Sequence, residues 1–151
     1  MPCSLARMAR FRASDVVVAG GVDLEALRLV LPRVDPRAVR IWVGPWWFRM
    51  FWGREIAAVA MAWGIYVRPD IMRRFADGRE PARNATLIVH ELAHLEQWRR
   101  LGVIRHSVQY LFDYVRGLVA GKGTQGAYRA IRLEVEARQT ARLVMAMSRP
   151  S

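Results

Sequence analysis

The chain has 151 residues, of which 53% are hydrophobic and 25% are charged, a balance that excludes an intrinsically disordered protein and fits one globular domain with a sizeable core. Its single cysteine, Cys3, excludes an internal disulfide framework and a cysteine-based zinc site, and it fits a reducing cytoplasm. The net charge of +11 comes almost entirely from arginine, because Lys122 is the only lysine.

The arginines are spread over the whole chain and do not form one basic run. No specific nucleic-acid partner is therefore expected, and the charge is first interpreted as a solvated surface. An acidic partner or a membrane surface, contacted through arginine and tryptophan, is the alternative. The N-terminus lacks the apolar run of a signal peptide, which predicts a cytoplasmic protein.

Short elements are predicted in the first part of the chain. Residues 1–21 combine basic side chains with the β-branched run 16–18, which predicts a short strand or an extended N-terminal arm. Asp23 is placed to cap a helix over residues 24–31, which Pro32 ends. Residues 38–43 alternate well enough for a strand.

Residues 44–53, GPWWFRMFWG, concentrate five aromatic side chains. They are interpreted as a packed aromatic cluster, with a patch facing a substrate or a membrane as the alternative. Residues 57–63 and 65–68 predict two strands joined at Gly64, followed by a helical turn over 70–75. These strands would form a small antiparallel sheet, to whose edge an extended substrate could add.

An uninterrupted helix is predicted over residues 82–101, with Pro81 suited to its first turn. It contains the motif H-E-x-x-H as His90, Glu91 and His94. Positions i and i+4 lie one turn apart on one helix face, so the two imidazoles can bind one Zn²⁺. Glu91, offset around the helix, can act as general base on the zinc-bound water. Two unrelated histidines on an amphipathic helix are the alternative, but the chain has only three histidines.

A catalytic zinc site needs a third protein ligand. Residues 103–119 predict a helix that offers His106 and Asp113. The position of His106 just beyond Gly102 is more typical of a loop or surface histidine, and no motif supports Asp113. The last predicted helix, residues 124–147, offers the acidic pair Glu134 and Glu136.

Glu134 and Glu136 lie two residues apart, which is roughly 200° around a helix, so at most one can face the metal. Periodicity alone does not decide between them. Either could instead be a surface carboxylate that pairs with Arg132 or Arg138.

The segment HELAHLEQW, followed by AYRAIRLEVEA, resembles the small gluzincin-type proteins of bacteria over residues 56–140. It is also similar, more loosely, to the active-site core of the M48 metallopeptidases, where the Glu of an E-x-x-x-D motif is the third ligand. That resemblance implies Glu134 as the ligand and places Arg138 where the motif has Asp. It further implies a zincin-like fold and peptide hydrolysis.

Together these patterns predict one mainly helical α+β, zincin-like domain over residues 1–151, with a zinc-dependent activity on peptide or protein substrates. Tyr128 is the candidate that would stabilise an oxyanion, although a tyrosine packed between helices fits the same position. Two other functions remain open. One is a non-catalytic, zinc-stabilised domain that binds a partner, and the other is a basic protein that binds a membrane surface or nucleic acid.

Overall fold

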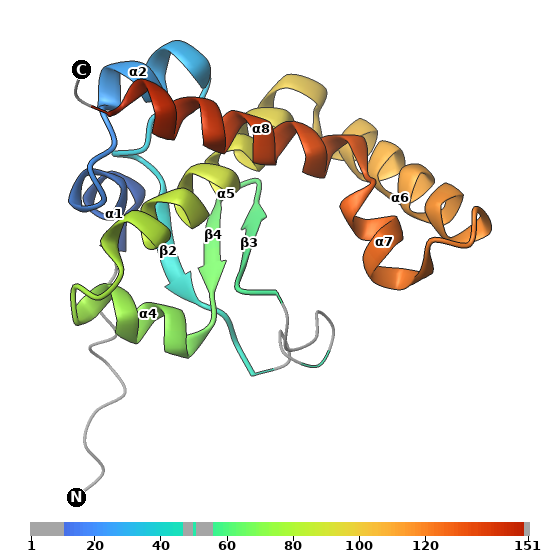
Figure 1. Ribbon diagram of the computed structural model, residues 1–151, viewed down its shortest axis with the longest axis horizontal. Helices are drawn as coiled ribbons and strands as arrows, with labels where there is room; N and C mark the ends of the chain where they lie inside the picture. Colours follow the sequence, from blue (N-terminus) through green and yellow to red (C-terminus); the bar gives the residue numbers. More distant parts are fainter. Residues whose placement is uncertain (1–10, 47–49, 51–55, 150–151) are drawn as a thin grey trace, which may run out of the picture.

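The computed structural model describes residues 11–46, 50 and 56–149 (Figure 1). Helices dominate, and all strands precede the helix that carries the H-E-x-x-H motif. The elements are β1 (Phe11–Arg12), α1 (Ala13–Ala19), α2 (Leu24–Val30), β2 (Arg40–Val43), β3 (Ala58–Met61), β4 (Gly64–Val67), α4 (Pro69–Ala76), α5 (Pro81–Leu101), α6 (Val103–Val119), α7 (Gly123–Arg129) and α8 (Arg132–Met147).

The strands form one sheet in the order β1-β2-β4-β3. β3 and β4 are the predicted pair joined near Gly64, and they run antiparallel with Ala60 opposite Ile65. β2 pairs with β4 in parallel, whereas β1 pairs with β2 antiparallel. The predicted mainly helical α+β class with a small sheet before the motif helix is confirmed, and the sheet is mixed because of the one parallel pairing.

α5 is the central element of the core. It packs against α1, α8 and β3, and Ile88, Leu92 and Leu95 on it are almost completely buried. The approach of α1 to α5 is close at Gly20, where an added Cβ would lie 2.2 Å from the Ala85 Cβ. Packing of α5 on several sides fixes the position of the motif at its centre, and each fully buried apolar side chain stabilises the fold by about 1.5–3 kcal/mol.

Two predicted elements differ from the observed ones. The run Val16–Val18 belongs to helix α1 and not to a strand or arm, because Asp15 accepts a hydrogen bond from the Arg12 amide at the start of the helix. The expected helix over 124–147 is divided into α7 and α8 at Ala130 and Ile131. Residues 123–129 and residues 132–147 therefore form two separate helices.

Asp113 on α6 fixes the start of α8. Its carboxylate accepts a hydrogen bond from the Arg132 amide, at 3.1 Å, and another from the Arg132 guanidinium. An acid at this position satisfies a free amide at the helix N-terminus and favours the helix dipole. Asp113 is therefore a structural residue that positions the first turn of α8.

Much of the aromatic segment 44–53 lies outside the described residues. Within it, Trp46 and Met50 are exposed. Among the described residues no helix has the length and apolarity that crossing a membrane requires.

Candidate metal centre

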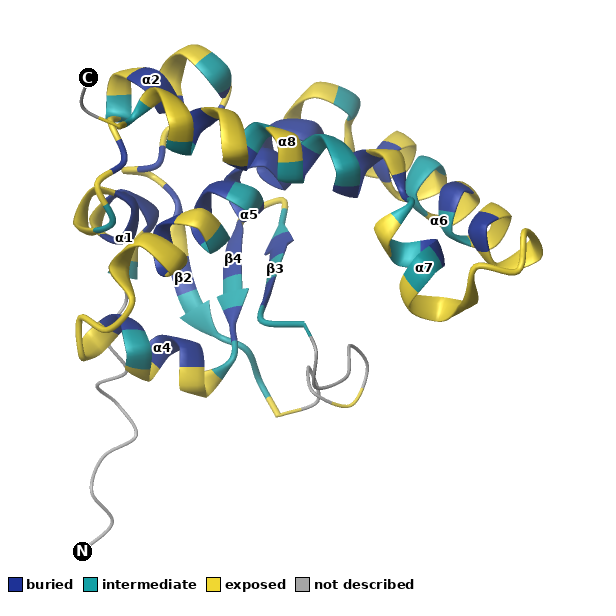
Figure 2. Cartoon of the chain, viewed as in Figure 1, coloured by how far each residue is buried: buried dark blue, intermediate teal, exposed yellow. Residues whose placement is uncertain are grey.

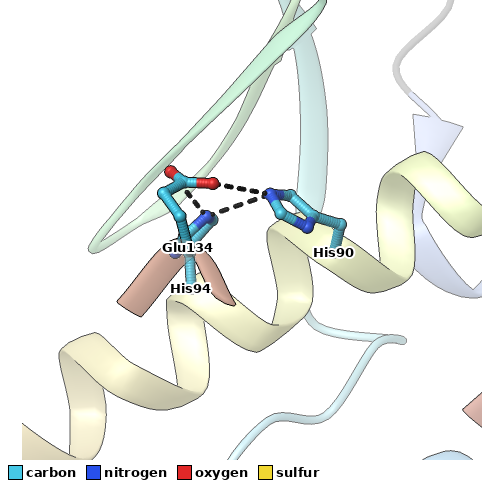
Figure 3. Close-up of side chains that lie close together, drawn as sticks. All are labelled: His90, His94 and Glu134. Atoms are coloured by element: carbon cyan, nitrogen blue, oxygen red, sulfur yellow. Dashed lines mark hydrogen bonds and ion pairs between the residues drawn. The ribbon is translucent and has the colours of Figure 1, made fainter. Parts of the chain in front are cut away.

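The two motif histidines on α5 and Glu134 on α8 meet at one point, as Figure 3 shows. The Nε2 atoms of His90 and His94 lie 3.2 Å apart. The Glu134 carboxylate places Oε2 3.3 Å from His90 Nε2 and Oε1 3.3 Å from His94 Nε2. This group of side chains is close enough to hold a metal ion.

The spacing of the two imidazole nitrogens fits a tetrahedral site. Ligand atoms about 2.0–2.1 Å from a tetrahedral ion lie roughly 3.3–3.4 Å from one another. The two Nε2 atoms are 3.2 Å apart, and each lies 3.3 Å from a different oxygen of the Glu134 carboxylate. Two imidazoles and one carboxylate are also the donor set of a known class of catalytic zinc site, in which the fourth position stays open.

Electrostatics at the cluster favour a cation. Burial acts to raise the pKa of Glu134, but hydrogen bonds from His90 and His94 outweigh burial and hold that pKa well below its usual range. Burial acts to lower the pKa of His94, whereas its contact with Glu134 and the charge of Glu91 raise it to about 8. In the metal-free protein a proton on His94 thus supplies the positive charge that the two carboxylates require.

Gln97 determines how His94 is oriented. Its Nε2 donates to the Leu133 carbonyl at 2.9 Å, which leaves its Oε1 to accept from His94 Nδ1, also at 2.9 Å. The proton of neutral His94 is therefore on Nδ1, and the Nε2 lone pair points at the cluster. Since Leu133 directly precedes Glu134, the buried Gln97 links the metal-ligating faces of α5 and α8.

Glu91 is buried beside the cluster and faces the edge strand. Its pKa is raised by burial, although the nearby charges of His94 and His90 act to lower it. A backbone hydrogen bond from Ala60 on β3 holds the carboxylate. A carboxylate with a raised pKa is suited to accept and release a proton near neutral pH.

A cavity of about 410 Å³ opens at this point between β3 and α6. Its polar lining includes Glu91, His94, Tyr110, Tyr128 and Glu134, and its apolar lining includes residues 58–61 of β3. β3 lies at the edge of the sheet and pairs only with β4 among the described strands. The cavity therefore joins His94 and Glu134, two of the three candidate metal ligands, to a strand edge that can accept another strand.

Two tyrosines contact Glu134. The Tyr110 hydroxyl lies 3.2 Å from Glu134 Oε1, and Tyr128 hydrogen-bonds both Glu134 and Tyr110. Burial raises the pKa of each phenol, so both remain protonated hydrogen-bond donors at neutral pH. The sequence indicated Tyr128 as a candidate for stabilising an oxyanion. It did not single out Tyr110, which lies one helical turn after His106 on the packed face of α6.

His106 is not the loop or surface residue that the sequence favoured. It is buried in the first turn of α6 and stacks on Trp98, with ring centroids 4.2 Å apart. Its ring centroid is 6.5 Å from that of His94. Neither ring nitrogen has a hydrogen-bond partner among the described residues, and burial lowers its pKa to about 4. A neutral imidazole thus lines the cavity without belonging to the metal cluster.

Glu134 and Glu136, the two acids that the sequence left open as the third ligand, differ in burial. Glu134 is almost fully buried, whereas Glu136 pairs with Arg100 at 2.8 Å on the surface. Arg138 occupies the position of the Asp in the E-x-x-x-D motif, and its guanidinium donates a hydrogen bond to the Arg129 carbonyl. A guanidinium cannot accept a hydrogen bond, and the acceptor for His94 Nδ1 is the side-chain oxygen of Gln97.

Comparisons of the chain with family models, with curated proteins and with solved structures gave no match.

Proposed function

We propose that this protein is a zinc-dependent hydrolase that cleaves peptide bonds. The proposal rests on one observation, the convergence of His90, His94 and Glu134 next to the buried carboxylate of Glu91. Zinc is favoured over harder cations because two of the three donors are imidazoles. The resemblance to gluzincin-type proteins and to the M48 core agrees with this assignment.

A zinc ion held by these residues would polarise a substrate carbonyl and make a water molecule more acidic. Glu91 would accept the proton of the attacking water on its carboxylate and transfer that proton to the leaving amine. Gln97 would hold His94 in the tautomer that binds metal. Tyr128, which lines the same cavity, would donate its hydroxyl hydrogen to the developing oxyanion.

The substrate fits as an extended chain. An added strand would pair with the edge of β3 that faces away from β4, apart from the Ala60 amide that Glu91 occupies, and would pass over His94 and Glu91, which line the same cavity as residues 58–61. Backbone hydrogen bonds to a strand edge are independent of side chains, so this part of the site would bind many sequences. Selectivity would then come from the α6 and α7 side chains across the cavity.

The test compares wild-type protein with Glu91→Gln, both loaded with zinc, on a mixture of peptides analysed by mass spectrometry. Loss of the base should lower turnover by roughly 100- to 10,000-fold, while zinc content stays unchanged. Glu136→Gln is the matched control, because it removes a surface carboxylate of α8 and should keep full turnover. Zinc-loaded wild-type protein that cuts no peptide would contradict the proposal and favour a non-catalytic, zinc-stabilised domain.

A further inference from the structure

Helix α6 exposes a large apolar face. In Figure 2 exposed segments run along α6 and α7, which extend away from the sheet. The helix packs through its other side, where His106, Asp113 and Gly117 are buried. The apolar face consists of eight exposed side chains, Val103, Ile104, Val108, Leu111, Phe112, Val115, Leu118 and Val119.

Most of these residues form one continuous stripe. Successive residues turn by about 100° around an α-helix, so positions 104, 108, 111, 115 and 118 follow one line along α6 and 112 and 119 lie beside it. The stripe is opposite to the buried line through His106 and Asp113. Phe112 and Val108 are 61% and 63% exposed, and Val119 is 84% exposed. Soluble proteins rarely leave a contiguous apolar area of this size facing water, and such areas mark contact surfaces.

The charge around the stripe identifies the kind of partner. Residues 103–132 contain five basic residues and one acid, Asp113. That acid is buried and paired with Arg132, so the segment keeps a net charge of +4, five minus one, from the other four basic residues. Arg105 and Arg116 follow one edge of the stripe, about 200–220° around the helix from Val103. An apolar face with a basic border is complementary to an apolar layer beneath anionic groups.

We propose that α6 docks on the surface of an anionic lipid bilayer, with its axis in the plane of the interface. The apolar stripe would enter the boundary between headgroups and acyl chains, and the arginines would contact lipid phosphates. Seventeen residues are too few to cross a bilayer, for which about 20 apolar residues are needed. A second copy of the chain fits less well, because each copy carries a net charge of +11.

This inference goes beyond the proposed hydrolase and does not depend on zinc. It also places the cavity near the membrane, because Leu111 belongs both to the stripe and to the cavity lining. A bilayer bound to α6 would thus lie beside the entrance to the candidate metal centre.

The experiment is sedimentation of the full chain with vesicles of phosphatidylcholine and phosphatidylglycerol, beside vesicles of phosphatidylcholine alone. Wild-type protein should bind the anionic vesicles, and binding should weaken steeply as salt rises. The triple variant Val108→Ser, Phe112→Ser, Val115→Ser should bind at least roughly 100-fold more weakly. The matched control changes exposed apolar residues of other helices, as Val18→Ser, Leu29→Ser, Leu143→Ser, and should bind like wild type.

A second variant, Arg105→Gln, Arg116→Gln, keeps the test valid if the triple variant does not fold. Each lost charge should weaken binding to anionic vesicles about fivefold. Circular dichroism and a cooperative thermal unfolding transition verify that each variant is folded. The proposal is overturned if wild-type protein ignores anionic vesicles, or if both triple variants bind equally. It is also overturned if light scattering shows a dimer that only the α6 triple variant dissociates.

Discussion

The Nε2 atom of His94 lies 3.3 Å from the Oε1 atom of Glu134, although the two residues belong to different helices. This contact links α5 to α8, which pack closely along the core. Two buried groups of this kind are costly unless a proton or a cation lies between them. A metal ion bound here would therefore be coupled to the stability of the helix pair, and five predictions follow from that coupling or from the adjacent cavity.

Metal removal should destabilise the wild-type protein. A ligand that binds only the folded state stabilises it by about 2.7 kcal/mol when its free concentration is 100 times Kd. Zinc added to chelator-treated protein should therefore raise Tm by several degrees in differential scanning calorimetry. In Glu134→Gln the same addition should leave Tm nearly unchanged, since one of the three ligands is lost. An equal shift in that variant would mean that zinc binds elsewhere.

The affinity for zinc should depend on pH through His94. Its pKa in the metal-free protein is raised to about 8, so below that pH a proton occupies the nitrogen that must bind the ion. Apparent affinity should fall about tenfold per pH unit below 8 and level off above it. Competition with a chromophoric chelator between pH 6.5 and 9 measures this slope.

The same shift has a second consequence for the metal-free protein. Because the folded pKa of His94 is raised, protonated His94 stabilises the fold below pH 6.5, and this contribution is lost as the pH rises through about 8. Urea unfolding of the metal-free chain should therefore show lower stability at pH 9 than at pH 6.5. A flat profile for both affinity and stability would contradict the His94–Glu134 contact.

Gln97 should act as a positioning residue. Replacement by Leu removes the hydrogen bonds that Gln97 makes to His94 Nδ1 and to the Leu133 carbonyl, so the buried His94 N–H loses its acceptor. We expect zinc affinity to fall by roughly 10- to 100-fold and stability to fall by about 1–3 kcal/mol. Gln139→Leu, at an exposed position of α8, is the matched control. A loss of stability without a change in zinc affinity would assign Gln97 to packing alone.

The two tyrosines of the cavity should have separable effects. Assayed at saturating zinc, Tyr128→Phe should lower kcat by roughly 100- to 1,000-fold with KM preserved, if its hydroxyl stabilises the oxyanion. Tyr110→Phe removes the hydrogen bond to Glu134 and should change zinc affinity more than kcat. Steady-state kinetics on one cleaved peptide decides between these roles. Equal kcat values for wild type and Tyr128→Phe would remove Tyr128 from the mechanism.

Much of the site could be predicted because it lies on one helix. The i, i+4 spacing of His90 and His94 and the uninterrupted apolar pattern of residues 82–101 are local properties, and α5 has the expected form. The third ligand depends on a contact between α5 and α8, so spacing within the last helix left Glu134 and Glu136 open. The fold places only Glu134 of this pair close to both imidazoles, because Glu134 faces the core and Glu136 faces the surface.

The arrangement of α6 could not be predicted, because its pattern is opposite to the usual one. Apolar side chains at helical spacing normally face a core. Here the packed face carries His106, Tyr110 and Asp113, which contact Trp98, Glu134 and Arg132. The polar face is buried because these partners satisfy it or stack on it, and the apolar face is left outside. Only the tertiary positions of α5 and α8 reveal this.

The most direct test of the proposed metal centre is the zinc content of the full chain, purified without chelators and measured by inductively coupled plasma mass spectrometry. Wild-type protein and Glu136→Gln should each bind about one zinc ion per chain, as the one cluster of ligand atoms among the described residues implies. His90→Ala and Glu134→Gln should bind little or none while their circular dichroism remains helical. Zinc bound equally by Glu134→Gln and wild type, or absent from folded wild-type protein incubated with zinc, would contradict the metal centre.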